Sequence, residues 1–535
     1  MRTISKTICD VRLRVLRPGK CRKVLAVRDR YGKISRGNLV FLTRGLSLLL
    51  VVTAFSMIMC CSVRADELLD AIRRQTGDYR QKLEELAQWC ESVGLTAEAE
   101  RTRRWLHPIV DDRLLIPLWP AEIGFDTPPE GFSQQQVEWY RRWTQLRKEQ
   151  ADKLFTLARG AVRKGRSGLA LDLAMAALHE NPDHEAIRRL FGYQKYAGFW
   201  RTNYEVRRLR AGDVWHEVFG WVPKAHVARY EKGERFFNGR WISAEEEASL
   251  RSNLQNGWVV ESEHYRVLTN HSREEGVKLL TRLEQLNELW SRLFIRFYAT
   301  EAQVMSLFDA RSRPAPLVPR QHKVILFRNR EEYVQALITA VPQIGITSGM
   351  YDSRTQTCYF FAGPQADPTT IYHEATHQMF QEVGKATSTP GLRGNFWIVE
   401  AAAMYMETLR TEEDFLVLGG IDTPRLLAAR VRFLQDHFYV PLREFVALGI
   451  KEWQSDTRIG ALYSQAAGLM QFLMHYDGGR YRDAAVNYLA SVYAGTDSLE
   501  TLSRLTNKSY TQLDEEYAAY LKSLPSLPPM RILGP

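Results

Sequence analysis

The sequence predicts a multidomain, mainly helical protein that also contains an α+β part. Its 535 residues exceed one ordinary hydrophobic core, so about two to four domains are expected. Apolar residues recur at helical spacing towards both ends of the chain, and alternating apolar segments lie between them. With 45% hydrophobic and 25% charged residues, the composition is that of a folded chain rather than a disordered one.

Residues 1–65 have the pattern of a signal peptide. They hold 14 Lys/Arg against 2 Asp, a net charge of +12, so the remaining chain carries −2. A basic stretch ends at Arg44, and an apolar run covers 46–60. Val63 and Ala65 are small or apolar residues at the positions that a signal peptidase reads, which suits cleavage after Ala65. We expect an exported protein, periplasmic, cell-surface or extracellular, without a stable membrane span once the signal is cleaved. An uncleaved leader would instead be an N-terminal membrane anchor.

The mature chain shows neither a nucleic-acid footprint nor a disulfide framework. Its excess of basic residues is confined to the leader, so no nucleic-acid partner is expected. Beyond residue 65 only Cys90 and Cys358 remain. These two could pair, but nothing in the sequence requires it, and no cysteine cluster has zinc-finger spacing.

Residues 66–193 are predicted to form an N-terminal helical domain. A long amphipathic helix is expected over 133–164 and a shorter one over 167–179, with a Pro-rich connection over 108–129 before them. Small residues on both helices suit close pairing, as in tetratricopeptide-like hairpins. Because only one such hairpin is visible, a packing role is favoured over a surface that binds a protein partner.

Residues 194–257 change in character and predict a small Trp-rich β module. Tryptophans recur from Trp200 to Trp258, and Gly or Asn-Gly turns separate them. Asn-Gly between apolar runs is a strong hairpin signal. The tryptophans could stack on sugars or on proline-rich peptides, but tryptophans spaced through hairpins more often form a core.

Residues 258–410 are predicted to form an α+β core, and residues 411–535 a C-terminal helical subdomain that completes its cleft. The elements expected in the core are a strand over 258–269, a helix over 272–298, a loop over 309–320, a strand from 322, a helix over 330–340, a hairpin over 347–361, and helices from 368 and over 396–410. Further helices are expected near 424–436, 441–449, 459–476, 479–493, 498–505 and 510–522.

The expected helix from Pro368 carries His373-Glu374-Ala375-Thr376-His377. Residues four apart lie on one side of a helix, so His373 and His377 present two imidazoles at a spacing that suits a shared zinc ion. Glu374 lies between them, where a carboxylate can accept a proton from a water on such an ion. The motif therefore predicts a zinc site with a general base beside it.

The next helix offers a third ligand, Glu400, within Trp-Ile-Val-Glu-Ala-Ala-Ala-Met-Tyr-Met-Glu. A carboxylate on a largely apolar helix is costly to bury unless it is paired or bound to a metal. Two histidines and one glutamate leave one open position, as a catalytic zinc requires. Glu407 lies two turns further on the same face. It could accept a hydrogen bond that orients a ligand imidazole, or it could be a solvated carboxylate at the helix end.

These two motifs resemble the gluzincin metallopeptidases, in which the third ligand lies in a Trp-x-x-Glu-Gly-x-Ala pattern on the helix after His-Glu-x-x-His. The resemblance implies His373, His377 and Glu400 as the zinc ligands and Glu374 as the general base. Gluzincins often use a further Tyr or His to stabilise the oxyanion. Tyr463 is the candidate for that role, and the alternative is a packing tyrosine.

The wider region from Trp258 to about Leu524 resembles an uncharacterised exported bacterial family called domain of unknown function 1570, which has a peptidase-MA-like core. Ala401 departs from the gluzincin pattern, which has Gly at this place. The resemblance implies a fold and a site but no substrate. The hairpin at 349–351 lies where such enzymes hold an extended peptide. The acidic residue with which aminopeptidases hold a free amine is not evident there, so an endopeptidase is favoured.

The sequence thus predicts an exported metallopeptidase that uses Zn²⁺ to hydrolyse bonds in a peptide or protein substrate. No third histidine follows closely enough for a metzincin. Two other classes are open: a catalytically inactive exported binding or scaffold protein with the same fold, and a zinc hydrolase that acts on a non-peptide bond. The intact set of site residues argues against the inactive protein.

Overall fold

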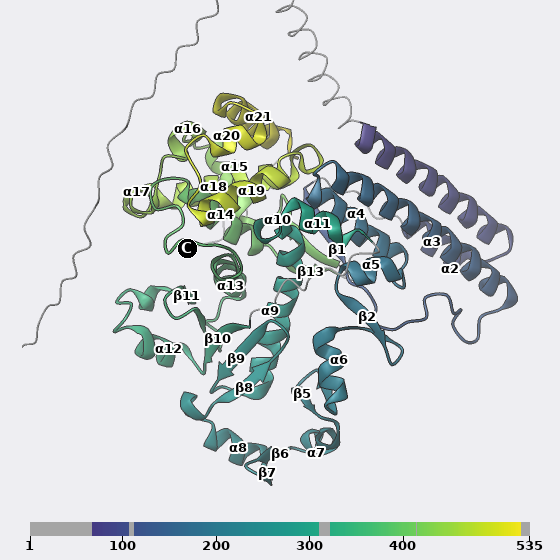
Figure 1. Cartoon of the computed structure of the whole chain (residues 1–535), viewed down its shortest axis with the longest axis horizontal. Coiled ribbons are helices and arrows are strands. Elements are labelled where there is room, and N and C mark those ends of the chain that lie inside the picture. Colours follow the sequence, from purple (N-terminus) through teal and green to yellow (C-terminus); the bar gives the residue numbers. More distant parts are fainter. Residues whose placement is uncertain (1–66, 106–111, 310–320, 413–414, 526–535) are drawn as a thin grey trace, which may run out of the picture. The chain divides into compact units, whose positions relative to one another are not determined.

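The computed structural model describes residues 67–105, 112–309, 321–412 and 415–525. The predicted signal peptide and all but the first residue of the loop predicted over 309–320 lie outside these ranges. From Leu68 onwards the chain forms one compact unit, which is mainly helical and contains several small sheets (Figure 1). Among the described residues, no helix is both long and apolar enough to cross a membrane.

The segment before residue 193 is built around the predicted helical hairpin, α3 (Gln134–Arg163) and α4 (Ser167–Glu180). α3 begins at a capping box, in which the Ser133 hydroxyl accepts a hydrogen bond from the Gln136 N–H. Fully buried alanines on both helices let the backbones approach closely. The other helices here lie over residues 67–92, in α2 (Thr96–Arg104) and in α5 (Glu185–Leu190).

A three-stranded antiparallel sheet joins this segment to the C-terminal half of the chain. β1 (Arg113–Pro117) pairs with β14 (Phe415–Gly419), which also pairs with β13 (Arg410–Glu412). The segment 108–129 was predicted to be a connection, but it contains the strand β1. The helix predicted over 396–410 ends at Met406, and Arg410 begins β13 instead. β13 and β14 are neighbours in the chain, but β1 and β14 lie far apart in the sequence, so no local pattern could indicate their pairing.

The predicted Trp-rich β module is a three-fold repeat of a short helix followed by a β-hairpin. In each copy an Arg precedes a Gly by four residues, and a Trp follows on the second strand: Arg188, Gly192 and Trp200; Arg208, Gly212 and Trp221; Arg229, Gly233 and Trp241. The glycines have φ of 85°, 90° and 85°, the left-handed conformation that ends a helix. Each guanidinium lies over the Trp ring of its own copy, 5.5, 5.6 and 3.9 Å from the ring centre.

The predicted hairpins of this module are confirmed, and helices alternate with them. Trp200 and Trp258 are buried, as a core role requires, whereas Trp215, Trp221 and Trp241 are only half-buried. The elements are β2 (Tyr193–Tyr196), β3 (Phe199–Thr202), α6 (Asn203–Arg210), β4 (Asp213–His216), β5 (Gly220–Pro223), η1 (Lys224–His226), α7 (Val227–Glu231), β6 (Glu234–Phe237), β7 (Arg240–Ser243), α8 (Ala244–Leu250) and η2 (Leu254–Asn256).

A five-stranded sheet with the order β11-β12-β10-β9-β8 supports the motif helix. β10 runs parallel to β9 and β12, and the two edge strands, β8 and β11, are antiparallel to their neighbours. The single strand predicted over 258–269 is a hairpin, because the Ser262 N–H donates to the Tyr265 carbonyl at 2.9 Å and closes a turn. The strands are β8 (Trp258–Glu261), β9 (Tyr265–Thr269), β10 (His322–Phe327), β11 (Met350–Asp352) and β12 (Thr357–Phe361).

α9 (Arg273–Leu293) and α13 (Pro368–Val383) contact this sheet, and α14 (Phe396–Met406) packs on α13 and α18 (Ile459–Gly479) (Figure 1). The helix predicted over 272–298 is interrupted at the fully buried Phe294, whose φ of −104° and ψ of 26° leave the helical region. The remaining elements are α10 (Ile295–Tyr298), α11 (Glu301–Leu307), α12 (Arg330–Leu337), η3 (Ile344–Ile346), α15 (Pro424–Leu434), α16 (Leu442–Phe445), α17 (Ile450–Ser455), α19 (Arg482–Ala494), α20 (Thr501–Thr506) and α21 (Tyr510–Ser523).

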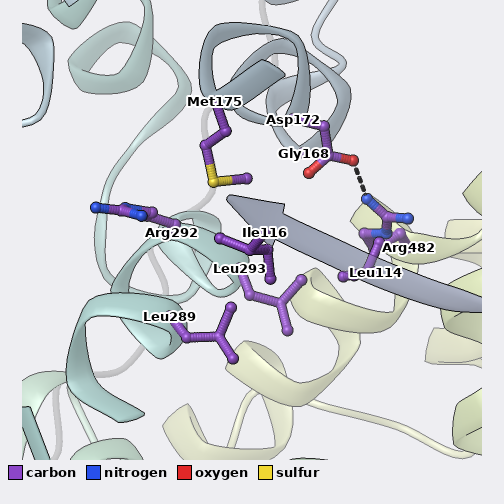
Figure 2. Close-up of a pocket in the computed structure, with 9 residues that line it drawn as sticks. All are labelled: Leu114, Ile116, Gly168, Asp172, Met175, Leu289, Arg292, Leu293 and Arg482. Atoms are coloured by element: carbon purple, nitrogen blue, oxygen red, sulfur yellow. Dashed lines mark hydrogen bonds and ion pairs between the residues drawn. The ribbon is translucent and has the colours of Figure 1, made fainter. Parts of the chain in front are cut away.

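An ion pair ties the helical hairpin to the C-terminal helices. Arg482, at the start of α19, is buried and pairs with Asp172 on α4, beside a cavity of about 10 Å³ that offers room for about one water (Figure 2). Ile116 and Leu293 line the same cavity, so β1 and α9 also meet there. Through this contact, the helical hairpin of α3 and α4 supports the position of α19.

We expect Asp172→Asn to lower the free energy of unfolding by about 1–3 kcal/mol, because it leaves the buried Arg482 without its counter-charge. The Asp172 side chain is 32% exposed, which keeps the effect below that of a fully buried pair. Urea denaturation measures it. Asp70→Asn is the matched control, because Asp70 pairs with Arg73 at the exposed surface. Equal shifts in both variants would contradict the prediction.

Candidate metal centre

The helix that carries the motif begins where the sequence predicts. Asp367 caps α13 by accepting a hydrogen bond from the Thr369 N–H at 2.9 Å, and Pro368 occupies the first helical position. Ala375 is fully buried against the core, so the opposite side of the helix presents His373 and His377. The local sequence therefore fixes which face of α13 carries the imidazoles.

The helix that carries Glu400 is held at its start by a buried asparagine. Asn395 has φ of 60°, and its amide donates to Asp497 at 2.6 Å and accepts from the Tyr488 hydroxyl at 2.5 Å. Residues 401–403 of α14 are alanines with no exposed surface, which lets α14 pack closely between α13 and α18. This close packing brings Glu400 to the imidazoles of α13.

Three ligand atoms converge at this point. The Nε2 atoms of His373 and His377 lie 3.1 Å apart, and the carboxylate oxygens of Glu400 lie 3.6 and 3.8 Å from them. Zinc bonds of 2.0–2.1 Å in a tetrahedral site place ligand atoms about 3.4 Å apart. The two side chains of His373 and His377 are 17% exposed and that of Glu400 is 13% exposed. The group could therefore hold a metal ion that solvent still reaches.

Glu407 orients His373 from behind. Its carboxylate lies 2.7 Å from His373 Nδ1, which leaves Nε2 directed at the other two ligand atoms. Arg425, in the first turn of α15, in turn donates two hydrogen bonds to Glu407, at 3.0 and 3.2 Å. Glu407 is therefore not a solvated carboxylate at the helix end, which was the alternative interpretation.

We expect Glu407→Ala to weaken metal binding about 10- to 100-fold, because the His373 ring loses the acceptor that fixes its tautomer and orientation. Competition with a chelator of known affinity measures this. Glu412→Ala removes an exposed carboxylate from the nearby strand β13 and is expected to leave the affinity unchanged. The same affinity in both variants would show that Glu407 does not support the site.

Glu374 accepts a hydrogen bond from the main-chain N–H of Tyr351 at 2.8 Å, which connects the motif helix to the edge strand β11. Burial raises the pKa of Glu374 to about 7, against the opposing charge of His373 and the hydrogen bond from Tyr351. A carboxylate with a pKa near neutrality suits proton transfer at physiological pH.

The ligand set carries a proton in the metal-free protein. Burial lowers the pKa of His373, but the neighbouring carboxylates of Glu400 and Glu407 outweigh it and raise the value to about 10. Burial lowers the pKa of His377 to about 4, so this imidazole is neutral. Burial raises the pKa of Glu400, but the neighbouring protonated His373 leaves it below its usual value. A metal ion must displace the His373 proton on binding.

Tyr463 also reaches this group. It lies in the first turns of α18 beside the Glu400 carboxylate, and it packs edge-on against Trp453 with ring centres 5.4 Å apart. Burial and the neighbouring Glu400 carboxylate raise the pKa of Tyr463, so the phenol keeps its proton and can donate it in a hydrogen bond.

The structure adds two contacts that the sequence did not indicate, although Tyr351 lies in the hairpin predicted to hold an extended peptide. Tyr351 and Arg425 contact Glu374 and Glu407, but neither belongs to a motif, and an arginine after Thr-Pro carries no recognisable signal. Cys90 and Cys358, which the sequence left open as a pair, are separate buried thiols.

Comparison with protein-family models finds none that matches this chain, and comparison with curated proteins finds none that is significantly similar. The resemblances drawn from the motifs therefore stay predictions. A functional proposal must rest on the residues and their geometry.

Proposed function

We propose that the protein is an exported, zinc-dependent metallopeptidase of the gluzincin type, with His373, His377 and Glu400 as the zinc ligands. The observation that carries the proposal is the convergence of these three side chains from two helices beside the half-buried Glu374. Two imidazoles and one carboxylate are a donor set that zinc accepts, and they leave a coordination position open. A bound zinc ion would supply a Lewis acid that lowers the pKa of a water ligand and polarises a carbonyl group.

Residues of the chain supply proton transfer, positioning of the reacting groups and stabilisation of the oxyanion. Glu374 takes the proton from the attacking water and returns it to the leaving amine. The Tyr351 N–H holds one oxygen of Glu374 in place, and Glu407 holds the ring of His373. The protonated Tyr463 phenol donates to the negative charge that develops on the carbonyl oxygen.

A peptide is the proposed substrate because β11 is an edge strand beside the site. It pairs only with β12 within the described sheet. Glu374 takes the Tyr351 N–H, so an extended chain would pair with the other main-chain groups of this edge. The acidic residue of this strand, Asp352, already pairs with Arg354 and Thr355 rather than being free for a substrate amine, which favours an endopeptidase. The leader at 1–65 supports export. For the helical segment before residue 193, a packing role stays favoured over a surface that binds a protein partner.

Metal analysis and a peptide-library assay of the purified protein test the proposal together. We expect one zinc ion per chain and cleavage of peptides that stops with a chelator and returns with zinc. Protein without bound metal even after zinc is supplied would contradict the zinc site. Bound zinc with hydrolysis of esters or other non-peptide bonds, but no peptide cleavage, would favour a different hydrolase. Bound zinc without any hydrolysis would favour the inactive binding protein.

We expect Tyr463→Phe to lower kcat about 10²- to 10³-fold while zinc content stays unchanged, because one donor to the developing oxyanion is lost. Tyr476→Phe, on the same helix but away from the three ligands, is the matched control and is expected to keep its activity. An active Tyr463→Phe variant would assign this residue to packing against Trp453.

A further inference from the structure

Tyr351 connects the edge strand of the sheet to two different carboxylates on the motif helix. Its main-chain N–H donates to Glu374 at 2.8 Å, and its hydroxyl donates to Glu382 at 3.2 Å. Glu374 and Glu382 lie two turns apart on α13, so one residue of β11 is fixed to the helix at two points. The hydroxyl contact plays no part in the proposed chemistry.

Glu382 is a buried anchor rather than a surface carboxylate. Its side chain is 1% exposed and pairs with His322 on β10, 2% exposed, at 2.9 Å. The amide of Gln378 donates to Glu382 at 3.1 Å and to the Lys323 carbonyl at 3.0 Å. Both Glu382 oxygens accept hydrogen bonds, one from Gln378 and Tyr351 and the other from His322, so any displacement of Glu382 leaves a buried polar atom without a partner. The Tyr351 hydroxyl is therefore tied to a rigid point shared by β10 and α13.

The backbone of β11 needs such an anchor. The strand has three residues and one neighbour, so its own ladder of hydrogen bonds is short. Gly349, just before it, lies so close to α13 that a Cβ there would be 2.8 Å from side-chain atoms of both Phe360 and Thr370. β11 thus lies directly against the helix, and small shifts of the strand would move the N–H that holds Glu374.

We propose that Tyr351 is the positioning residue for the general base. Its phenol is fixed to the Glu382–His322 pair, and this holds the main-chain N–H of Tyr351 where it aims Glu374 at the metal centre. The inference rests on the proposed role of Glu374, but the geometry that it claims exists with or without turnover. No sequence pattern indicates this role, because one contact of Tyr351 comes from its main-chain N–H and the other from its side-chain hydroxyl.

Hydrogen exchange at the Tyr351 amide, followed by mass spectrometry, tests the geometry. We expect this amide to exchange at least about tenfold faster in Tyr351→Phe, which keeps the ring but loses the bond to Glu382, and also in Glu374→Ala, which removes the acceptor. Tyr439→Phe is the matched control, because it removes a tyrosine hydroxyl bound to a carboxylate, Asp514, in the C-terminal helices. Unchanged exchange in Tyr351→Phe would overturn the proposal, whether or not the protein is an enzyme.

A double-mutant cycle tests the consequence for the base. With a peptide that the protein cleaves, we expect Tyr351→Phe to lower kcat about tenfold at unchanged zinc content, and to have no further effect in the Glu374→Gln background. Equal factors in both backgrounds would mean that Tyr351 acts independently of Glu374, against the proposal. If the wild type bound zinc and cleaved nothing, the proposed peptidase function would fail, while the exchange experiment would still decide the positioning role.

Discussion

Replacement of Glu374 by glutamine is expected to lower kcat/KM by about 10²- to 10⁴-fold and to leave one zinc ion bound per chain. Glutamine has the size of glutamate, and its carbonyl oxygen can still accept the hydrogen bond from the Tyr351 N–H at this position. It cannot accept a proton from water at neutral pH. Because His373, His377 and Glu400 are untouched, metal binding and catalysis should separate in this one variant.

Zinc content by mass spectrometry and the initial rate on the same sample check this result. Glu331→Gln, an exposed carboxylate on α12, is the matched control and should keep full activity. Burial raises the pKa of Glu374 to about 7 without metal, and a bound cation would lower it. The wild-type rate is therefore expected to fall as the pH drops through a value at or below about 7, where the base becomes protonated. A fully active Glu374→Gln variant would remove Glu374 from the mechanism.

The sequence was sufficient for the parts of the site that depend on one helix. The spacing of His373 and His377 sets their common face, and the start of α13 at Pro368 follows from its cap. Glu400 was predicted because a carboxylate among alanines needs a partner, and the structure gives it two imidazoles. The first two inferences succeed because helical geometry relates residues that are close in sequence, whereas the inference on Glu400, which lies on another helix, rests on the cost of burying an unpaired carboxylate.

The parts that the sequence did not reveal depend on contacts between distant segments. Arg425 reaches Glu407 only because α15 follows the β13–β14 hairpin, and β14 pairs with a strand from the N-terminal half. Tyr351 reaches Glu382 across a sheet edge. The short helices of the three-fold repeat were missed as well. The repeat is present in the spacing of Arg, Gly and Trp, but the tryptophans alone indicate only the hairpins.

Removal of the third ligand, Glu400, should weaken metal binding, whereas removal of the base, Glu374, should leave it unchanged. We expect Glu400→Ala to weaken zinc binding more than about 100-fold, beyond the effect of Glu407→Ala, because a direct ligand contributes more than a residue that orients one. Activity at limiting zinc should disappear.

Chelator competition on Glu400→Ala measures the affinity, and circular dichroism shows whether α14 still folds. We expect the variant to keep its folded structure, because Asn395 holds the start of α14 through Asp497 and Tyr488, away from Glu400. Glu400→Gln is the second variant: it keeps the shape and the partner of Tyr463 but loses the charge, so its affinity should lie between those of the wild type and Glu400→Ala. Wild-type affinity in Glu400→Ala would place the third ligand elsewhere, and Glu407, 2.7 Å from His373, would then be the first residue to test.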